Sequence, residues 1–146
     1  MHQNLSVNGM LIDDIAVGMS ASYSQTITDS DIKSFAGISG DNNPVHMSDE
    51  YAEQSRFGKR IAHGLISASF FSALFGTRIP GPGCVYVSQS LNFKKPVYIG
   101  DTVTASVTVV RVDKDKNRIF FDTICKVKGR IVIAGEAELY IPVKKS

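Results

Sequence analysis

The sequence has no apolar run long enough to cross a lipid bilayer, which takes about 20 residues. Its most apolar stretch, residues 65–75, contains three serines and is typical of a buried helix. The N-terminus lacks a basic segment followed by a long apolar stretch, since Met10-Leu11-Ile12 runs directly into two aspartates. We therefore predict no secretory signal peptide and no membrane partner.

Neither sign of charge dominates the chain. Sixteen basic and fourteen acidic side chains leave a formal net charge of +2. Binding of nucleic acid depends on clustered lysine and arginine, so this balance predicts no nucleic-acid partner. It is compatible with a small anionic ligand held by a few local cations.

Cysteine is scarce. Cys84 and Cys125 form no C-x-x-C pair, have no adjacent histidine and lie in strand-like apolar runs. Such thiols are usually buried and free. Together with the missing signal peptide they predict a cytoplasmic protein, because the cytoplasm keeps thiols reduced.

No repeat, low-complexity segment or linker divides the 146 residues, which is the length of one ordinary domain. A chain of this size buries about 68–70% of its unfolded surface, enough for a core without metals or disulfides. Apolar residues make up 43% and charged residues 21%, which is ordinary for a folded domain. We therefore predict a single domain over residues 1–146.

The first half of the chain has helical and loop-like patterns after a loosely alternating, strand-like stretch at residues 20–27. Thr28 to Asp31 have the form of a capping box, and predict a helix that stops at Ser39-Gly40. Ser48, followed by two acidic residues, predicts the start of a second helix. We expect that helix to end near residues 56–58.

A third helix is predicted over residues 63–75, stopped by Gly76 and by Pro80 beyond it. It is apolar nearly all round, which is typical of a helix enclosed by other structure. The remaining sequence alternates with a period of two and predicts antiparallel strands. These strands cover residues 85–93, 102–109, 119–127 and 131–141, the last with Ile131, Ile133, Gly135, Ala137, Leu139 and Ile141 on one face. The predicted fold is α+β, a curved antiparallel sheet wrapped around a central apolar helix, which is the hot-dog arrangement.

A bent loop carries an aspartate and a histidine. Pro44 pushes Asn43 out of the helical region, and Gly40 supplies backbone freedom on the other side. The loop can therefore aim Asp41 and His46 at one point. A carboxylate beside an imidazole is a serviceable proton-transfer pair near neutral pH, although an aspartate base needs an apolar setting to raise its pKa from ~3.9. An Asx-turn with a surface histidine would have the same spacing.

Gly64 stands where the apolar helix starts. A helix N-terminus presents unpaired N–H groups and about +0.5 of an elementary charge, and a glycine lets a ligand carbonyl come close to them. The same glycine could simply clear space for packing. The adjacent His63 fits a structural, hydrogen-bonding histidine, and Ser72 fits a helical serine bonded to the carbonyl four residues earlier.

Taken together, these stretches resemble a known family. Ser-Gly-Asp-x-Asn-Pro-x-His at residues 39–46, followed by Phe57-Gly58 and Ile61-Ala62-His63-Gly64, closely resembles the (R)-specific enoyl-CoA hydratases, the MaoC-like branch of the hot-dog fold. The resemblance covers about residues 20–141. The ordered combination is far more specific than either motif alone.

The resemblance implies a role for each matched residue. Asp41 and His46 would hold and activate water, Gly64 would donate its N–H to the thioester carbonyl, and Ser72 would hydrogen-bond near the pair. Water would add across a trans-2-enoyl thioester to give the (R)-3-hydroxyacyl thioester, without a metal or an organic cofactor. Such a pair and such a donor are worth about 10²–10⁴ and 10²–10³ in rate. Asn43 and His63, from the same motifs, would contact the substrate.

Cations should hold the anionic end of coenzyme A at the pocket mouth. Arg56, Lys59 and Arg60 lie between the two motifs, and Lys94 and Lys95 form a second candidate pair. Each of them could equally be an ordinary solvated side chain. A single hot-dog unit leaves sheet edges and one helix flank poorly covered, so we also expect a homodimer.

Other activities stay open at this point. A 3-hydroxyacyl-[acyl-carrier-protein] dehydratase would use the same chemistry on the same pantetheine arm. A non-catalytic acyl-thioester binding module needs no proton-transfer pair, so Asp41, His46 and Gly64 together argue against it. A hot-dog thioesterase does not usually carry this loop. Acyl chain length depends on pocket depth, and the candidates to line or block that pocket are Phe70, Phe71, Leu74 and Phe75.

Overall fold

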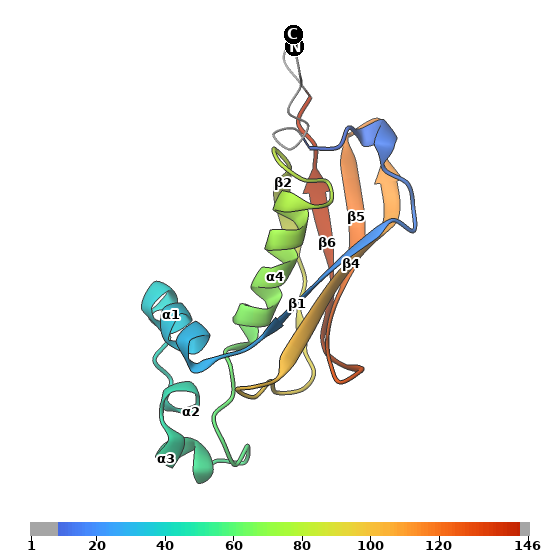
Figure 1. The fold of residues 1–146 in the computed structure, drawn as a ribbon. Helices are drawn as coiled ribbons and strands as arrows, with labels where there is room; N and C mark the ends of the chain where they lie inside the picture. The colour runs from blue at the N-terminus through green and yellow to red at the C-terminus, as the bar shows by residue number, and fades with distance from the viewer. Residues whose placement is uncertain (1–8, 144–146) are drawn as a thin grey trace.

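The computed structural model describes residues 9–143. One sheet of six strands curves around one long helix (Figure 1). In chain order the elements are η1 (Ile12–Asp14), β1 (Ser20–Thr26), α1 (Asp29–Ser39), α2 (Pro44–Met47), α3 (Asp49–Glu53), α4 (Gly64–Thr77), β2 (Val85–Gln89), β3 (Asn92–Phe93), β4 (Thr102–Asp113), β5 (Arg118–Val127) and β6 (Arg130–Tyr140). The strand order is β1-β4-β5-β6-β2, all antiparallel, and β3 pairs with β6. This is the predicted hot-dog fold.

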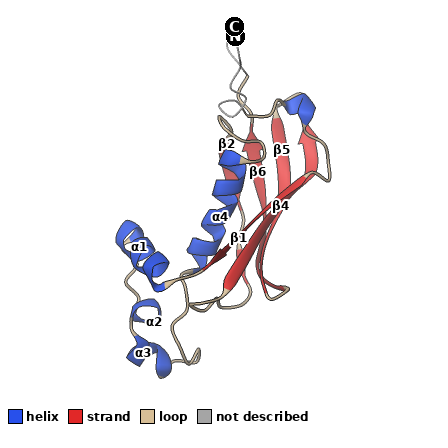
Figure 2. Cartoon of the chain, viewed as in Figure 1, coloured by secondary structure: helices blue, strands red, loops and turns tan. Residues whose placement is uncertain are grey.

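The core lies between α4 and the strands that curve around it. The alternation predicted for β4 and β5 is confirmed over most of each strand, because every second side chain is buried from Val103 to Val109 and from Ile119 to Cys125. On α4 the buried residues are Ile66, Ser67, Ala68, Phe70, Phe71, Leu74 and Phe75. Figure 2 shows α4 along the strands, with α1, α2 and α3 grouped beyond its N-terminal end. The N-terminal end of α4 therefore faces the three shorter helices.

Two predicted helix ends are wrong. The helix that starts after Ser48 stops at Glu53 rather than near residues 56–58, because Ser55 Oγ donates to the carbonyl of Ala52 (2.6 Å) and accepts from the N–H of Phe57 (3.2 Å). Such local side-chain bonds compete with a helix. Helix α4 runs through Gly76 to Thr77, since the packing of its buried face outweighs a glycine cost of about 1 kcal/mol.

The strand predictions need two corrections. The run over residues 85–93 is split into β2 and β3, because Ser90 crosses directly over Gly135 and its Oγ accepts from the N–H of Glu136 (2.9 Å). A register shift between β5 and β6 turns Ile131 outward to 37% exposure and buries Val132 in its place. A β-bulge of this kind moves side chains to the other face, which alternation alone does not predict.

One flank of α4 and the outer edge of β2 are uncovered in the single chain. Leu65 of α4 is 53% exposed, and the side chains of Val85, Tyr86 and Val87 are 46%, 38% and 42% exposed. The expectation of a helix enclosed on all sides is therefore met only in part. None of the helices within residues 9–143 has the length and apolar character that a bilayer crossing requires.

Candidate active site

A cavity of about 360 Å³ opens where the Asp41 loop, the first turn of α4 and the segment after β3 meet. Asp41, His46, His63 and Gly64 all line it. The fold brings these residues together because α1, α2 and α3 group beyond the N-terminal end of α4 (Figure 1), where the ring of His63 contacts the carbonyl of Asp41 in the loop after α1. The two sequence motifs, separated by α3 along the chain, thus share one pocket.

The Asp41 loop is shaped by short polar bonds. The capping box at Thr28 is present, and α1 ends at Gly40 with φ of 79°, a left-handed conformation that favours glycine. The carboxylate of Asp41 accepts from the N–H of Asn43 (3.1 Å), and the side chain of Asn43 accepts from the N–H of Val45 (3.1 Å). Asn43 is thus the N-cap of α2, which sequence patterns did not predict as a helix.

His46 is held so that one ring nitrogen remains free for chemistry. Its Nδ1 lies 2.7 Å from the carbonyl oxygen of Ile61, and a carbonyl can only accept, so Nδ1 carries the proton. In the neutral ring Nε2 then bears the lone pair. Burial lowers the pKa of His46 below its ordinary value of 6.5, which favours the neutral ring at pH 7. His46 is therefore poised as a base.

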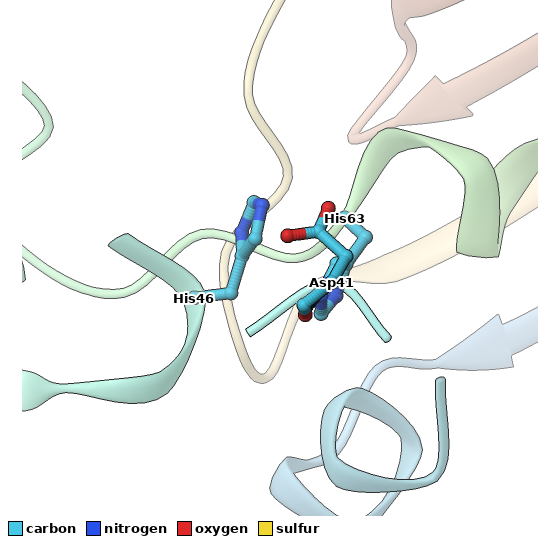
Figure 3. A group of neighbouring side chains, drawn as sticks. All are labelled: Asp41, His46 and His63. Carbon is cyan, nitrogen blue, oxygen red and sulfur yellow. Dashed lines mark hydrogen bonds between the residues drawn. The ribbon is translucent and has the colours of Figure 1, made fainter. Parts of the chain in front are cut away.

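The carboxylate of Asp41 completes the pair. It points toward the ring of His46 (Figure 3), and its negative charge acts to raise the pKa of His46 against the larger effect of burial. Asp41 itself is exposed, whereas only 8% of His46 is exposed. The pair therefore joins a buried acceptor to a carboxylate at the edge of solvent, where water can reach both.

His63 fastens the Asp41 loop to the start of α4. Its Nε2 lies 2.9 Å from the backbone carbonyl of Asp41 and donates to it. Its ring is packed between His46 (centroids 4.0 Å apart) and Phe35 (4.7 Å), and 3% of the residue is exposed. The other ring nitrogen, Nδ1, has no hydrogen-bond partner among the described residues. This arrangement positions both members of the pair.

Gly64 is the first residue of α4, and no side chain caps that helix start. Gly64 and Leu65 line the cavity, so the positive end of the helix dipole lies at its wall. A β-carbon at Gly64 would come within 2.5 Å of the ring of Phe93. The packing alternative is therefore met by Phe93, and access for a ligand carbonyl stays a prediction that is compatible with it.

Comparison with known proteins identifies the family. The MaoC-like domain model matches residues 14–135. An (R)-specific enoyl-CoA hydratase from Rhodospirillum rubrum is 53% identical over 132 residues, which cover 90% of this chain and 92% of that relative. This chain belongs to the MaoC-like family. A second MaoC-like relative, a 3-hydroxybutyryl-CoA dehydratase from Methylorubrum extorquens, is 43% identical over 93% of this chain and 87% of its own.

The MaoC-like assignment extends to the solved structures. The (R)-hydratase from A. caviae superimposes with a TM-score of 0.85 at 37% identity, covering 88% of this chain and 98% of that one. The family resemblance and hot-dog fold predicted from sequence are therefore both confirmed.

The cations predicted for the MaoC-like pocket mouth have different positions. Arg56 lines the cavity, with its guanidinium 5.0 Å from the ring centroid of Phe57, and Lys94 and Lys95 line it as well. Lys59 is outside the lining, with its ammonium 4.8 Å from the ring centroid of Tyr98. Three cations therefore remain at the cavity.

Arg60 is turned inward and does not line the cavity. Its side chain is 10% exposed, donates from Nε to the carbonyl of His46 (2.6 Å) and forms an ion pair with Asp29 (2.6 Å). Its charge is thus used to hold α2 against α1. We assign Arg60 to the support of His46 rather than to the ligand.

Ser72 lies in a second hollow between α4 and β2, which also includes Leu65, Ser69 and Tyr86. It does not line the cavity of the Asp41–His46 pair. Leu65 lines both hollows, so an acyl chain that extends away from the Asp41–His46 pair could pass Leu65 and reach Ser72. The apolar side chains proposed to limit chain length, Phe70, Phe71, Leu74 and Phe75, are buried in the core and line neither hollow.

Asp41, His46 and His63 each bring one possible metal-ligand atom within 4.8 Å of the others. One ring nitrogen of each histidine is already bonded to a backbone carbonyl, which leaves the carboxylate, His46 Nε2 and His63 Nδ1. A cation at this place would have to use these atoms, and the first two are also what proton transfer requires.

Two members of the site were missed by sequence reasoning. The carbonyl of Ile61 fixes the tautomer of His46, and no side-chain pattern reports on a carbonyl. The sequence pattern predicts Phe93 only as the end of a strand. Its place next to two lysines, after a strand-like run, was a signal for a strand end at a pocket mouth.

Proposed function

We propose that this chain adds water reversibly to trans-2-enoyl-CoA and forms (R)-3-hydroxyacyl-CoA. The observation that carries the proposal is the convergence of His46 Nε2, the Asp41 carboxylate and the N–H end of α4 on one cavity. The (R)-specific enoyl-CoA hydratase from R. rubrum, 53% identical, supports the same activity.

The reaction follows from this geometry. The thioester oxygen accepts from the N–H of Gly64, which draws electron density from C3 of the conjugated double bond. A water held by the Asp41–His46 pair gives one proton to the pair, and the water oxygen bonds to C3. The electron pair of the double bond moves toward the thioester oxygen as an enolate. The pair then returns a proton to C2 on the same face, and the carbonyl re-forms.

The anionic end of the substrate would meet Arg56, Lys94 and Lys95 at the mouth of the cavity. These cations fit the phosphates of coenzyme A. A phosphopantetheine arm on an acyl-carrier protein carries one of the same phosphates, so the dehydratase alternative predicts activity on both carriers. Comparing the turnover of crotonyl-CoA with that of crotonyl-[acyl-carrier protein] distinguishes the hydratase from the dehydratase alternative.

We further propose that the active form is a homodimer. The free edge of β2 and the exposed flank of α4 are adjacent, and both carry apolar side chains. A second copy could extend the sheet across the β2 edge and cover Leu65. Location in the cytoplasm is part of the same proposal, supported by two free thiols at Cys84 and Cys125.

The test is loss of enoyl absorbance with crotonyl-CoA and longer enoyl-CoAs, together with the stereochemistry of the product. We expect turnover and the (R)-alcohol. An (S)-product, or binding of the thioesters without turnover at any chain length, would contradict the proposal. The latter result would favour the non-catalytic binding module.

A further inference from the structure

We propose that Phe93 is a substrate-positioning residue, whose ring forms the wall that holds the thioester group against the N–H of Gly64. The inference rests on the proposed hydratase function and deepens it, because it identifies a contact that fixes the reacting carbonyl. In the proposed reaction Asp41 and His46 act on the water and on C2, so another residue must hold the carbonyl.

The ring of Phe93 lies directly on the first residue of α4. A β-carbon built on Gly64 would come 2.5 Å from Cε1 and 2.6 Å from Cδ1 of Phe93, so only a hydrogen fits between them. Gly64 and Phe93 both line the cavity. An oxygen that accepts from the N–H of Gly64 therefore lies beside this ring.

The backbone that carries Phe93 is fixed on both sides. β3 pairs Phe93 with Ile133 of β6, and the N–H of Lys94 donates to Val132 (2.8 Å). Further along, the carbonyl of Val97 accepts from the N–H of Ala62 (2.7 Å), just before α4. The wall is thus anchored to the sheet and to the approach to the helix.

The side chain itself is uncovered. Phe93 is 54% exposed although it is a large aromatic residue on a fixed backbone. Aromatic rings are among the residues that gain most from burial, so a ring left open at the cavity offers a surface to an apolar part of the ligand.

The substrate group that meets this surface follows from chain order. Lys94 and Lys95 come directly after Phe93 and line the same cavity. A carrier arm that runs from the N–H of Gly64 to these cations therefore passes the ring. The sulfur and first atoms of the arm are apolar enough to pack on it.

The experiment compares two substrates, crotonyl-CoA and crotonyl-N-acetylcysteamine, which lacks the nucleotide. We expect F93A to lower kcat/KM by roughly 10–100-fold on both, because a small misplacement of the carbonyl costs this much. F93L should keep most of the activity. The matched control is Y51A, since Tyr51 is 55% exposed and lies outside the cavity lining.

F93A with unchanged kcat and KM on the short thioester would overturn the proposal, as would a loss that disappears once the variants are compared at equal distance below their Tm. Binding of butyryl-CoA, which cannot react, supplies a readout without turnover. It should weaken about 10-fold in F93A. If the wild-type protein binds butyryl-CoA but hydrates no enoyl thioester, the proposed hydratase function is wrong. The contact between Phe93 and the thioester group can still be tested by the binding measurement.

A double-mutant cycle between Gly64 and Phe93 checks the contact directly. G64A keeps the N–H but must push the ring aside, so its effect should be small or absent in the F93A background. An equal loss from G64A in both backgrounds would show that Phe93 is not what the glycine accommodates, and would overturn the proposal.

Discussion

The protonation of His46 is governed more by burial and by a backbone carbonyl than by the side chains beside it. The carbonyl of Ile61 holds Nδ1–H, and burial disfavours the charged ring. Beneath it, His63 adds a second ring that acts to lower the pKa of His46 further. The residues that prepare the base thus come from the approach to α4 and from its N-cap.

We predict an acid limb for kcat/KM that lies below pH 6.5. The base works as the neutral ring, and the folded pKa of His46 lies below 6.5, so activity falls only as the pH drops through that lower value. The same shift makes the unfolded chain bind the extra proton first, so stability also declines as pH falls from 6.5 toward the folded pKa.

The measurement is NMR titration of His46 alongside the rate profile. D41N should lower the pKa of His46 still further, because it removes the charge that raises it. A pKa of His46 above 6.5 in the folded protein, or one that rises in D41N, would contradict this account.

The Asp41–His46 pair should behave as one unit. We expect D41N and H46Q each to lower kcat by roughly 10²–10⁴ with KM little changed, because the thioester is held elsewhere. The double variant should be barely slower than the slower single variant. Full activity in either folded single variant would show that the loop is structural.

Between elements, Arg60 connects the start of α1 at Asp29 with His46 of α2. R60M removes the bond from Nε to the carbonyl of His46, and we expect unfolding to become easier by about 1–3 kcal/mol. Activity should fall with it, since His46 loses its support. R60K keeps the charge but not the two-point geometry. Denaturant unfolding measures the stability and kcat measures the activity. An R60M variant with the stability and kcat of the wild type would show that Arg60 does not support His46.

A crossing between strands also depends on one residue. A β-carbon at Gly135 would come within 1.8 Å of the carbonyl oxygen of Ser90, a backbone atom that cannot step aside cheaply. We expect G135A to destabilise the fold by about 2–4 kcal/mol. The control is G37A in α1, where nothing lies within 4 Å and alanine should stabilise by up to about 1 kcal/mol. Equal melting temperatures for G135A and G37A would contradict the close contact between Gly135 and the carbonyl of Ser90.

The elements that sequence predicted well are those governed by local patterns. The capping box at Thr28, the stop at Gly40 and the alternation of β4 and β5 are present as expected. Apart from the end of α3, which the local bonds of Ser55 set, the failures depended on tertiary contacts. Ile131 is turned out by a register shift, and Arg60, one of several cations in a loop, is drawn inward by Asp29, far away in sequence.

For the whole molecule, the homodimer makes a direct prediction. V87K places a charge on the β2 edge, where a second copy would pair, and should halve the mass measured by light scattering at micromolar concentration. V110K is the control, because Val110 is as exposed (43% against 42%) but lies on β4, inside the sheet order. A monomeric wild-type protein with full activity would rule the dimer out.

The bond from His46 to Ile61 also bears on how the family can vary. Because the acceptor is a main-chain oxygen, any side chain that fits at position 61 can provide it. Alanine scanning at this site would report only the loss of packing, because I61A keeps the carbonyl. The tautomer of His46 is thus set by the path of the backbone. Substitutions of the side chains around it can therefore leave the proton transfer intact.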